Sequence, residues 1–166
     1  MNGALNSFRQ KAVALLNEHG IRAVAAMEST PRKQWDGPVA AVSLRRMVCA
    51  PGGFQDYLGI HTAPGTGKSG ELYGKAVEFT LSLDVYAPRN TGESTCQAAA
   101  EGMAEVLACQ GLGGIPVVEI RAGAVEFLSQ DGLYRLPVEC TCKGWLTAAA
   151  DDPGSFVDFE VKGSRL

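Results

Sequence analysis

The 166-residue sequence lacks several features that would place it in a well-marked class of proteins. Its first segment, MNGALNSFRQKAVALLNEHG, has no apolar secretory core, and no apolar run approaches the roughly 20 residues that cross a bilayer. The five cysteines are odd in number and form no CxxC knuckle, which argues against a disulfide framework and a zinc site. We therefore expect a soluble protein, made in the cytoplasm with reduced thiols, without membrane, metal or other cofactor.

Positive charge is also scarce. The chain has 15 Lys+Arg against 18 Asp+Glu, a formal net charge of −3, and its basic residues cluster no further than pairs such as Arg32-Lys33 and Arg45-Arg46. A protein that holds DNA or RNA usually neutralises phosphates with a basic surplus or stripe. The composition therefore disfavours direct nucleic-acid binding, but it permits a weakly acidic surface past which DNA travels.

The sequence does contain the patterns of one folded domain. Hydrophobic residues make up 46% and charged residues 20% of the chain, an ordinary globular composition. Apolar spacing predicts a helix over 3–18 and a second over 94–109, where Ser94 and Gln97 fit a capping box. We expect residues 1–150 to form a single domain.

Strand-like patterns fill most of the remaining chain. They cover 21–27, 39–50, 72–87, 116–128 and 133–148. In 72–87 apolar residues alternate with polar ones, and we expect Glu78 and Asp84 to lie on a solvated face. Asp131-Gly132 predicts a hairpin between the last two strands. The whole predicts an α+β fold, a mainly antiparallel sheet packed with two amphipathic helices.

Two segments show no regular pattern. Residues 51–74 are rich in glycine and predict a long loop, and loops of such length are often functional or become ordered in a complex. Residues 151–166 read as a linker followed by the short apolar tail FVDFEV. Such a short apolar segment does not fold stably by itself, so we expect it to dock on its own domain or on a neighbouring subunit.

The stretch APGTGKSG at 63–70 ends like a phosphate-binding P-loop, in Gly67-Lys68-Ser69. The first glycine of that pattern would stand where this chain has Thr62. A P-loop also follows a buried strand and opens a helix, whereas this stretch runs through glycines into an alternating strand. A P-loop-like nucleotide-binding enzyme is therefore the less favoured alternative.

Other chemical signatures are equally weak. Cys140 and Cys142 share one side of a strand, and buried thiols acting as small hydrophobic groups explain them better than a metal does. His19 fits the C-terminal end of the first helix, and His61 is expected to be solvated in the loop. We find no catalytic, cofactor-binding or metal-ligating set, and we expect a protein that is not an enzyme.

The order of the elements resembles the tail terminator or tail-completion proteins of long-tailed bacteriophages and phage-tail-like particles. The resemblance rests on Glu71-Leu72-Tyr73-Gly74 leading into the strand that ends Val85-Tyr86-Ala87-Pro88, then on helix 94–109 and the paired strands 116–128 and 133–148. It covers nearly the whole chain, and it is a likeness of pattern and layout without an invariant motif. The tail after residue 155 departs from the simplest form of the family.

The resemblance implies a structural virion protein with no catalytic residues. Such proteins form a hexameric ring at the head-proximal end of the tail tube, end the polymerisation of the tube and in contractile tails of the sheath, and join the tail to the neck or head connector. DNA passes through the lumen without specific binding. The implied location is the virion tail or a phage-tail-like particle, assembled in the cytoplasm of a bacterial host. Another neck, collar or baseplate adaptor is the alternative.

A ring subunit needs surfaces that become buried only on assembly. We expect these surfaces among exposed aromatic and cationic residues of the loops and the tail, although local packing explains the loop tryptophan equally well. The candidate interface residues are Trp35, Phe54, Tyr57, Lys68, Tyr73, Arg89, Phe156 and Phe159.

Overall fold

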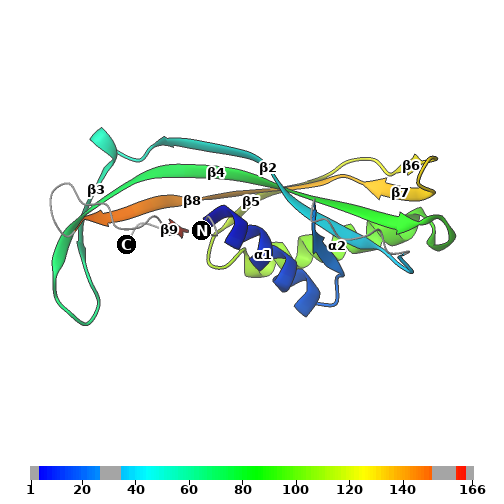
Figure 1. Cartoon of the computed structure of the whole chain (residues 1–166), viewed down its shortest axis with the longest axis horizontal. Coiled ribbons are helices and arrows are strands. Elements are labelled where there is room, and N and C mark those ends of the chain that lie inside the picture. Colours follow the sequence, from blue (N-terminus) through cyan, green and yellow to red (C-terminus); the bar gives the residue numbers. More distant parts are fainter. Residues whose placement is uncertain (1–3, 27–34, 151–159, 164–166) are drawn as a thin grey trace.

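A computed structural model describes residues 4–26, 35–150 and 160–163. These residues form an elongated, mostly antiparallel nine-stranded sheet with two helices against one of its faces (Figure 1). The predicted α+β class is therefore confirmed. Among the described residues, neither helix is long and apolar enough to cross a membrane.

The helices are α1 (Ala4–Glu18) and α2 (Glu93–Gln110), and two short 3-10 turns are η1 (Phe54–Asp56) and η2 (Arg89–Thr91). The strands are β1 (Ala23–Ala25), β2 (Val39–Pro51), β3 (Tyr57–Thr62), β4 (Ser69–Pro88), β5 (Val117–Ala122), β6 (Glu126–Leu128), β7 (Leu133–Leu136), β8 (Val138–Ala150) and β9 (Glu160–Lys162).

The central strand is β4, which is 20 residues long. On one side it pairs with β2 and β3, and on the other with β7 and β8, all antiparallel. Short strands complete the sheet: β1 lies parallel to β2, β6 pairs with β7, and β5 and β9 pair with β8. The last of the chain's described strands thus lies against its own domain.

The hydrophobic core lies between the sheet and the two helices. The alternation predicted for β4 is confirmed, because its odd-numbered apolar residues from Val77 to Val85 are all buried. Phe8 of α1 meets Phe79 edge to face at 4.8 Å, and Met103 of α2 is fully buried in the same cluster. Burial of one apolar stripe per helix is what the predicted spacing requires.

The predicted capping box of the second helix is wrong. The helix begins at Glu93, and its N-cap residue is Gly92, which has no side chain to make a capping hydrogen bond. Instead, Thr95 Oγ1 donates a hydrogen bond to the Gly92 carbonyl at 2.8 Å, and Thr91 Oγ1 donates to Pro88 at 2.8 Å. Thr91 of the preceding turn and Thr95 of the first helical turn therefore fix the start of α2 by hydrogen bonds to backbone carbonyls, which a spacing rule misses.

The predicted long loop at 51–74 is also wrong. β2 continues to Pro51, β3 occupies 57–62, and β4 begins at Ser69, so the hairpin turn is confined to 63–68. Gly52, Gly53 and Gly74 allow close packing in this segment. A Cβ at Gly74 would lie 2.6 Å from the Leu146 carbonyl oxygen and 2.9 Å from Leu58 Cδ1. The pairing partners on β4, which sequence periodicity does not reveal, make this segment a strand.

The predicted hairpin through Asp131-Gly132 is confirmed at its turn, where Gly132 N donates to the Leu128 carbonyl at 2.9 Å. Each of its two predicted strands is interrupted. Residues 123–125 separate β5 from β6, and Pro137, which has no N–H to donate, separates β7 from β8. Gly123 N donates to the Pro137 carbonyl at 2.8 Å, so the two interruptions face each other.

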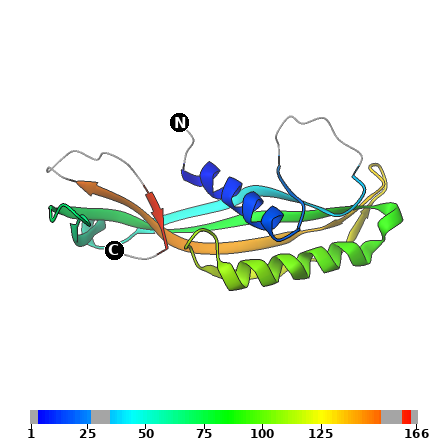
Figure 2. The same cartoon turned by 90° about the horizontal axis from the view of Figure 1, so that it is seen from below.

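The two helices cover only part of one sheet face (Figure 2). They lie beneath the half of the sheet where β4 ends, and the β3–β4 hairpin extends past them at the other end (Figure 1). We call residues 52–73 the arm. We call the face without helices the open face.

Candidate assembly surface

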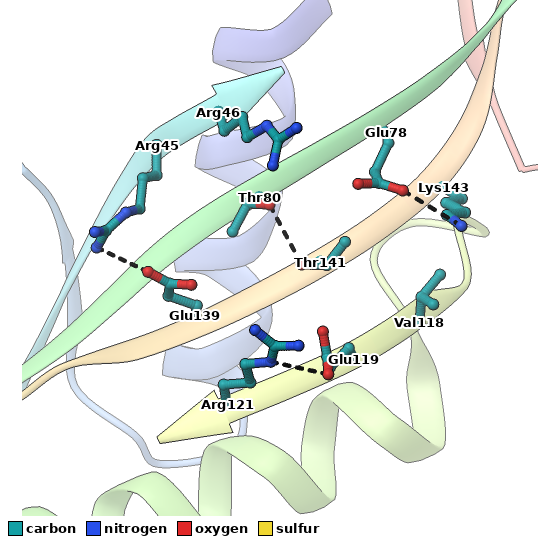
Figure 3. Close-up of a pocket in the computed structure, with 10 residues that line it drawn as sticks. All are labelled: Arg45, Arg46, Glu78, Thr80, Val118, Glu119, Arg121, Glu139, Thr141 and Lys143. Carbon is teal, nitrogen blue, oxygen red and sulfur yellow. Dashed lines mark hydrogen bonds and ion pairs between the residues drawn. The ribbon is translucent and has the colours of Figure 1, made fainter. Parts of the chain in front are cut away.

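The open face carries rows of polar side chains across β4 and β8. Thr80 faces Thr141, with their hydroxyl oxygens 3.3 Å apart, and Glu78 faces Lys143 (Figure 3). These residues alternate with the buried core residues of the same strands. The sequence pattern that builds the core on one face therefore builds a polar surface on the other.

Ion pairs neutralise most of the charge on the open face. Arg45 contacts Glu139 at 2.8 Å, Arg121 contacts Glu119 at 2.9 Å, and Lys143 contacts Glu78 at 3.3 Å. These side chains are between one third and three quarters exposed, so each pair adds little to stability. Within the described chain Arg46 has no ion-pair partner, and it is the one uncompensated cation of this surface (Figure 3).

These side chains line a shallow polar depression of about 430 Å³. No group of three His, Cys, Asp or Glu residues that could hold a metal occurs in the part of the chain that the structure describes. The depression offers paired charges and threonine hydroxyls on a rigid sheet. Such a surface can make weak polar contacts over a wide area.

One residue expected on the solvated face is buried instead. Asp84 is 8% exposed, and Arg135 Nη2 donates to its Oδ2 at 2.7 Å while Ser82 Oγ donates to its Oδ1 at 2.9 Å. The hydrogen bond to Asp84 is the main cause that raises the pKa of Arg135. The expectation failed because β7 brings an arginine from 51 residues further along the chain.

One edge of the sheet is bare along much of β2. β1 pairs with Ala40–Val42 only, and over residues 43–51 no described residue forms a backbone hydrogen bond on the outer side of the strand. Leu44, Met47 and Val48 in this stretch are 39%, 46% and 40% exposed. An open strand edge with exposed apolar side chains is a site for pairing with another chain.

The opposite edge of the sheet is bare as well. β5 pairs only with β8, so its outer side has no strand partner among the described residues, and Val118 is 53% exposed. Sequence reasoning missed both edges. Periodicity within a strand does not reveal which strand is outermost, because that depends on the order in which the strands pair.

Four predicted interface residues lie on the arm. Phe54 is 86% exposed, Lys68 is exposed in the hairpin turn, and Tyr57 and Tyr73 stack edge to face with ring centroids 5.5 Å apart. The Tyr73 hydroxyl donates to Glu71 Oε2 at 2.6 Å, which raises the pKa of Tyr73 above its ordinary value.

The backbone of the arm holds Phe54 outward. Pro51 pairs with Lys75 and Tyr57 with Tyr73, so the five residues 52–56 bulge opposite the single residue Gly74. Gln55 and the next residue adopt positive φ angles of 52° and 63°. Such angles are costly for residues other than glycine and are concentrated at functional positions.

Two further predicted interface residues, Trp35 and Arg89, do not lie on the arm. Trp35 packs on Tyr86 at 6.2 Å, and Arg89 stacks over the ring of Phe127 at 5.6 Å, both where β4 finishes. Phe156 and Phe159 lie outside the described residues. The described candidates therefore form two groups at opposite ends of the long sheet rather than one site.

The P-loop-like stretch forms the hairpin turn of the arm. Ala63 N donates to the Lys68 carbonyl at 2.9 Å, and the chain continues from Ser69 directly into β4 without a helix. His61 lies in β3 and is partly buried, which corrects the expectation of a solvated loop residue. His19 follows the end of α1 as predicted, with Nδ1 2.9 Å from the Leu15 carbonyl oxygen.

The cysteine pair faces the core as predicted. Cys140 and Cys142 are fully buried, with their sulfur atoms 3.8 Å apart, and the neighbouring thiol and burial raise the pKa of Cys140. All five cysteines are free thiols, and Cys49 and Cys109 are exposed.

The chain matches no protein-family model, and a search of curated proteins returns no match.

Proposed function

We propose that this protein is a tail terminator: a structural subunit that forms a ring on the head-proximal end of a phage or phage-like tail tube and ends tube growth. The observation that carries the proposal is the asymmetry of the sheet. Helices cover part of one face, the other face is polar, and on both long edges the outer strand has an open side among the described residues. Identical sheets of this kind add edge to edge with their polar faces on the same side.

Strand directions support edge-to-edge addition. β2 runs antiparallel to β4, and β5 runs parallel to β4 because each is antiparallel to β8. When a second copy is placed beside the first in the same orientation, its β5 meets β2 in the antiparallel sense. Antiparallel edges form regular hydrogen bonds, and a head-to-tail contact of this kind closes into a ring when the rotation between copies permits.

The charge of the open face suits a channel for DNA. In the depression on this face, three carboxylates pair with three of the four cations, which are Arg45, Arg46, Arg121 and Lys143. Binding of duplex DNA strengthens with every phosphate that a protein cation neutralises. A surface with one unpaired cation per copy lets DNA pass without holding it.

The two ends of the sheet supply different contacts along the ring axis. The arm presents Phe54 and Ile60, which are 86% and 72% exposed, whereas the other end carries Arg89 stacked on Phe127. We propose that the arm contacts the tail tube and that the opposite end contacts the neck or connector protein.

The test is a capping assay with the tube protein of the same particle. Tube subunits are polymerised with and without this protein, and tube lengths and ends are examined by electron microscopy. We expect shorter tubes with a ring at one end. A Phe54→Ser variant should form rings but cap poorly, whereas Phe127→Ser should cap normally. Unchanged tube lengths and bare ends with the native protein would reject the proposed function.

A further inference from the structure

The bare edge of β2 presents two apolar side chains on the helix side of the sheet. Met47 pairs with Phe79 and Leu44 with Leu81, so both share the face on which the core is built. β1 pairs with β2 only as far as Val42, so it covers neither side chain. Both remain more than one third exposed. Met47, which is unbranched, and Leu44, which branches at Cγ, thus project beside an open strand edge.

A groove of about 550 Å³ lies on the same face at the opposite edge, between α2 and β5. Its floor is apolar and consists of Ala100, Ala104, Ile120, Val125, Leu136 and Val138. Small alanine side chains on the helix leave the space. Groove volumes of this size accept one or two large apolar side chains.

The two edges of the sheet differ in charge. β2 contains two arginines and no acidic residue, whereas α2 contains three glutamates and no basic residue. Glu93 and Glu101 of α2 lie at the groove, and Glu119 stands on the outer strand β5. Arg46, which has no ion-pair partner in the described chain, stands on β2 next to Met47 but points to the open face, as Glu119 does, and not toward the groove.

We propose that Met47 and Leu44 of one copy insert into the α2–β5 groove of a second copy. The contact joins the two opposite edges of the sheet, so it is heterologous and each copy offers one donor and one acceptor surface. When β5 of the second copy pairs with β2, Ile120 of the groove lies on the same face as Met47. Only one step rests on the proposed function, namely that successive contacts of this kind close into a ring.

Face specificity gives the first test. Met47→Asp places a charge in the groove, whereas Val48→Asp changes a similarly exposed residue of the same strand on the open face, where Val48 pairs with Glu78. We expect Met47→Asp to convert the native assembly to monomers in native mass spectrometry, and Val48→Asp to assemble. A native protein that is only monomeric, or equal loss of assembly in both variants, would overturn the proposal.

Complementation gives the second test. Ala104→Trp fills the groove but keeps the β2 edge, and Met47→Asp spoils the edge but keeps the groove. We expect each variant alone to be monomeric and an equimolar mixture to form 1:1 dimers and nothing larger. Dimers of Ala104→Trp alone would show a β2–β2 contact and overturn the proposal.

Folding and function are separated by two readouts. Circular dichroism and thermal unfolding should be unchanged in each variant, and Gln97→Trp at the exposed rim of the groove replaces Ala104→Trp if that variant unfolds early.

Rings that depend on Met47 but do not cap tubes would uphold this contact and reject the tail terminator function. Capping by a Met47→Asp ring would reject the contact and uphold the function.

Discussion

Arg135 on β7 donates two hydrogen bonds to one oxygen of Asp84 on β4, from Nη2 at 2.7 Å and from Nε at 3.1 Å. Ser82 holds the other oxygen of the carboxylate at 2.9 Å. The contact lies beyond the end of β8, where only the short β7 continues the sheet along β4. It therefore attaches the β6–β7 hairpin to the central strand.

Removal of this arginine should destabilise the fold. In Arg135→Ala, the 8% exposed Asp84 loses two hydrogen bonds and keeps the one from Ser82, so we expect a loss of about 1–3 kcal/mol in the free energy of unfolding. Urea denaturation measures it. Arg121→Ala, whose ion pair with Glu119 is well exposed, is the control and should change stability by less than about 1 kcal/mol. Equal effects would contradict this account of Asp84.

The close approach of strands at Gly74 predicts a second stability effect. A Cβ there would lie 2.6 Å from the Leu146 carbonyl oxygen, so Gly74→Ala should cost about 1–3 kcal/mol through displaced backbone. Gly37→Ala is the matched control, because nothing lies within 4 Å of its Cβ position. Chemical denaturation compares the two. Native stability in Gly74→Ala would mean that β4 and β8 are not so close.

The arm predicts a titration signature. The Tyr73 hydroxyl bonds Glu71, and loss of its proton would place two anions together, so its pKa lies above the ordinary 10.0. Because the pKa of Tyr73 is raised in the folded state, the stabilisation by the Tyr73–Glu71 hydrogen bond is fully present below pH 10. It is lost as the pH rises through the folded-state pKa of Tyr73. Ultraviolet titration should show one late tyrosine that Glu71→Gln shifts to lower pH. An unshifted profile would mean that the bond does not form in solution.

The hairpin turn that carries Lys68 should not bind nucleotide. A P-loop holds phosphates with the N-terminus of a helix, and here the chain enters β4 directly after the turn. Calorimetric titration with ATP and Mg²⁺ should give no saturable binding, and Lys68→Ala should behave like the native protein. Saturable binding that disappears in Lys68→Ala would favour the nucleotide-binding alternative.

The sequence predicted what depends on local periodicity. The alternation from Val77 to Val85 identified the central strand and its buried face, and the apolar spacing of α1 and α2 identified both helices to within a residue or two. These patterns arise because one face of each element is buried, which the residues themselves record.

Features that depend on distant partners were not predicted. The arm was taken for a loop because glycine weakens strand patterns, yet pairing with β4 supplies the hydrogen bonds that propensity does not. The burial of Asp84 requires Arg135, and the open edge of β2 follows from the absence of a further paired strand beyond Val42 among the described residues.

The most direct test of the account is a cryo-electron microscopy reconstruction of tail tubes capped with this protein. We predict a six-fold ring at one tube end in which Arg46, Thr80 and Thr141 face the channel, the helices lie outside, and Met47 is buried between neighbouring copies. Tube ends without the protein, or a ring in which the helices line the channel, would contradict it.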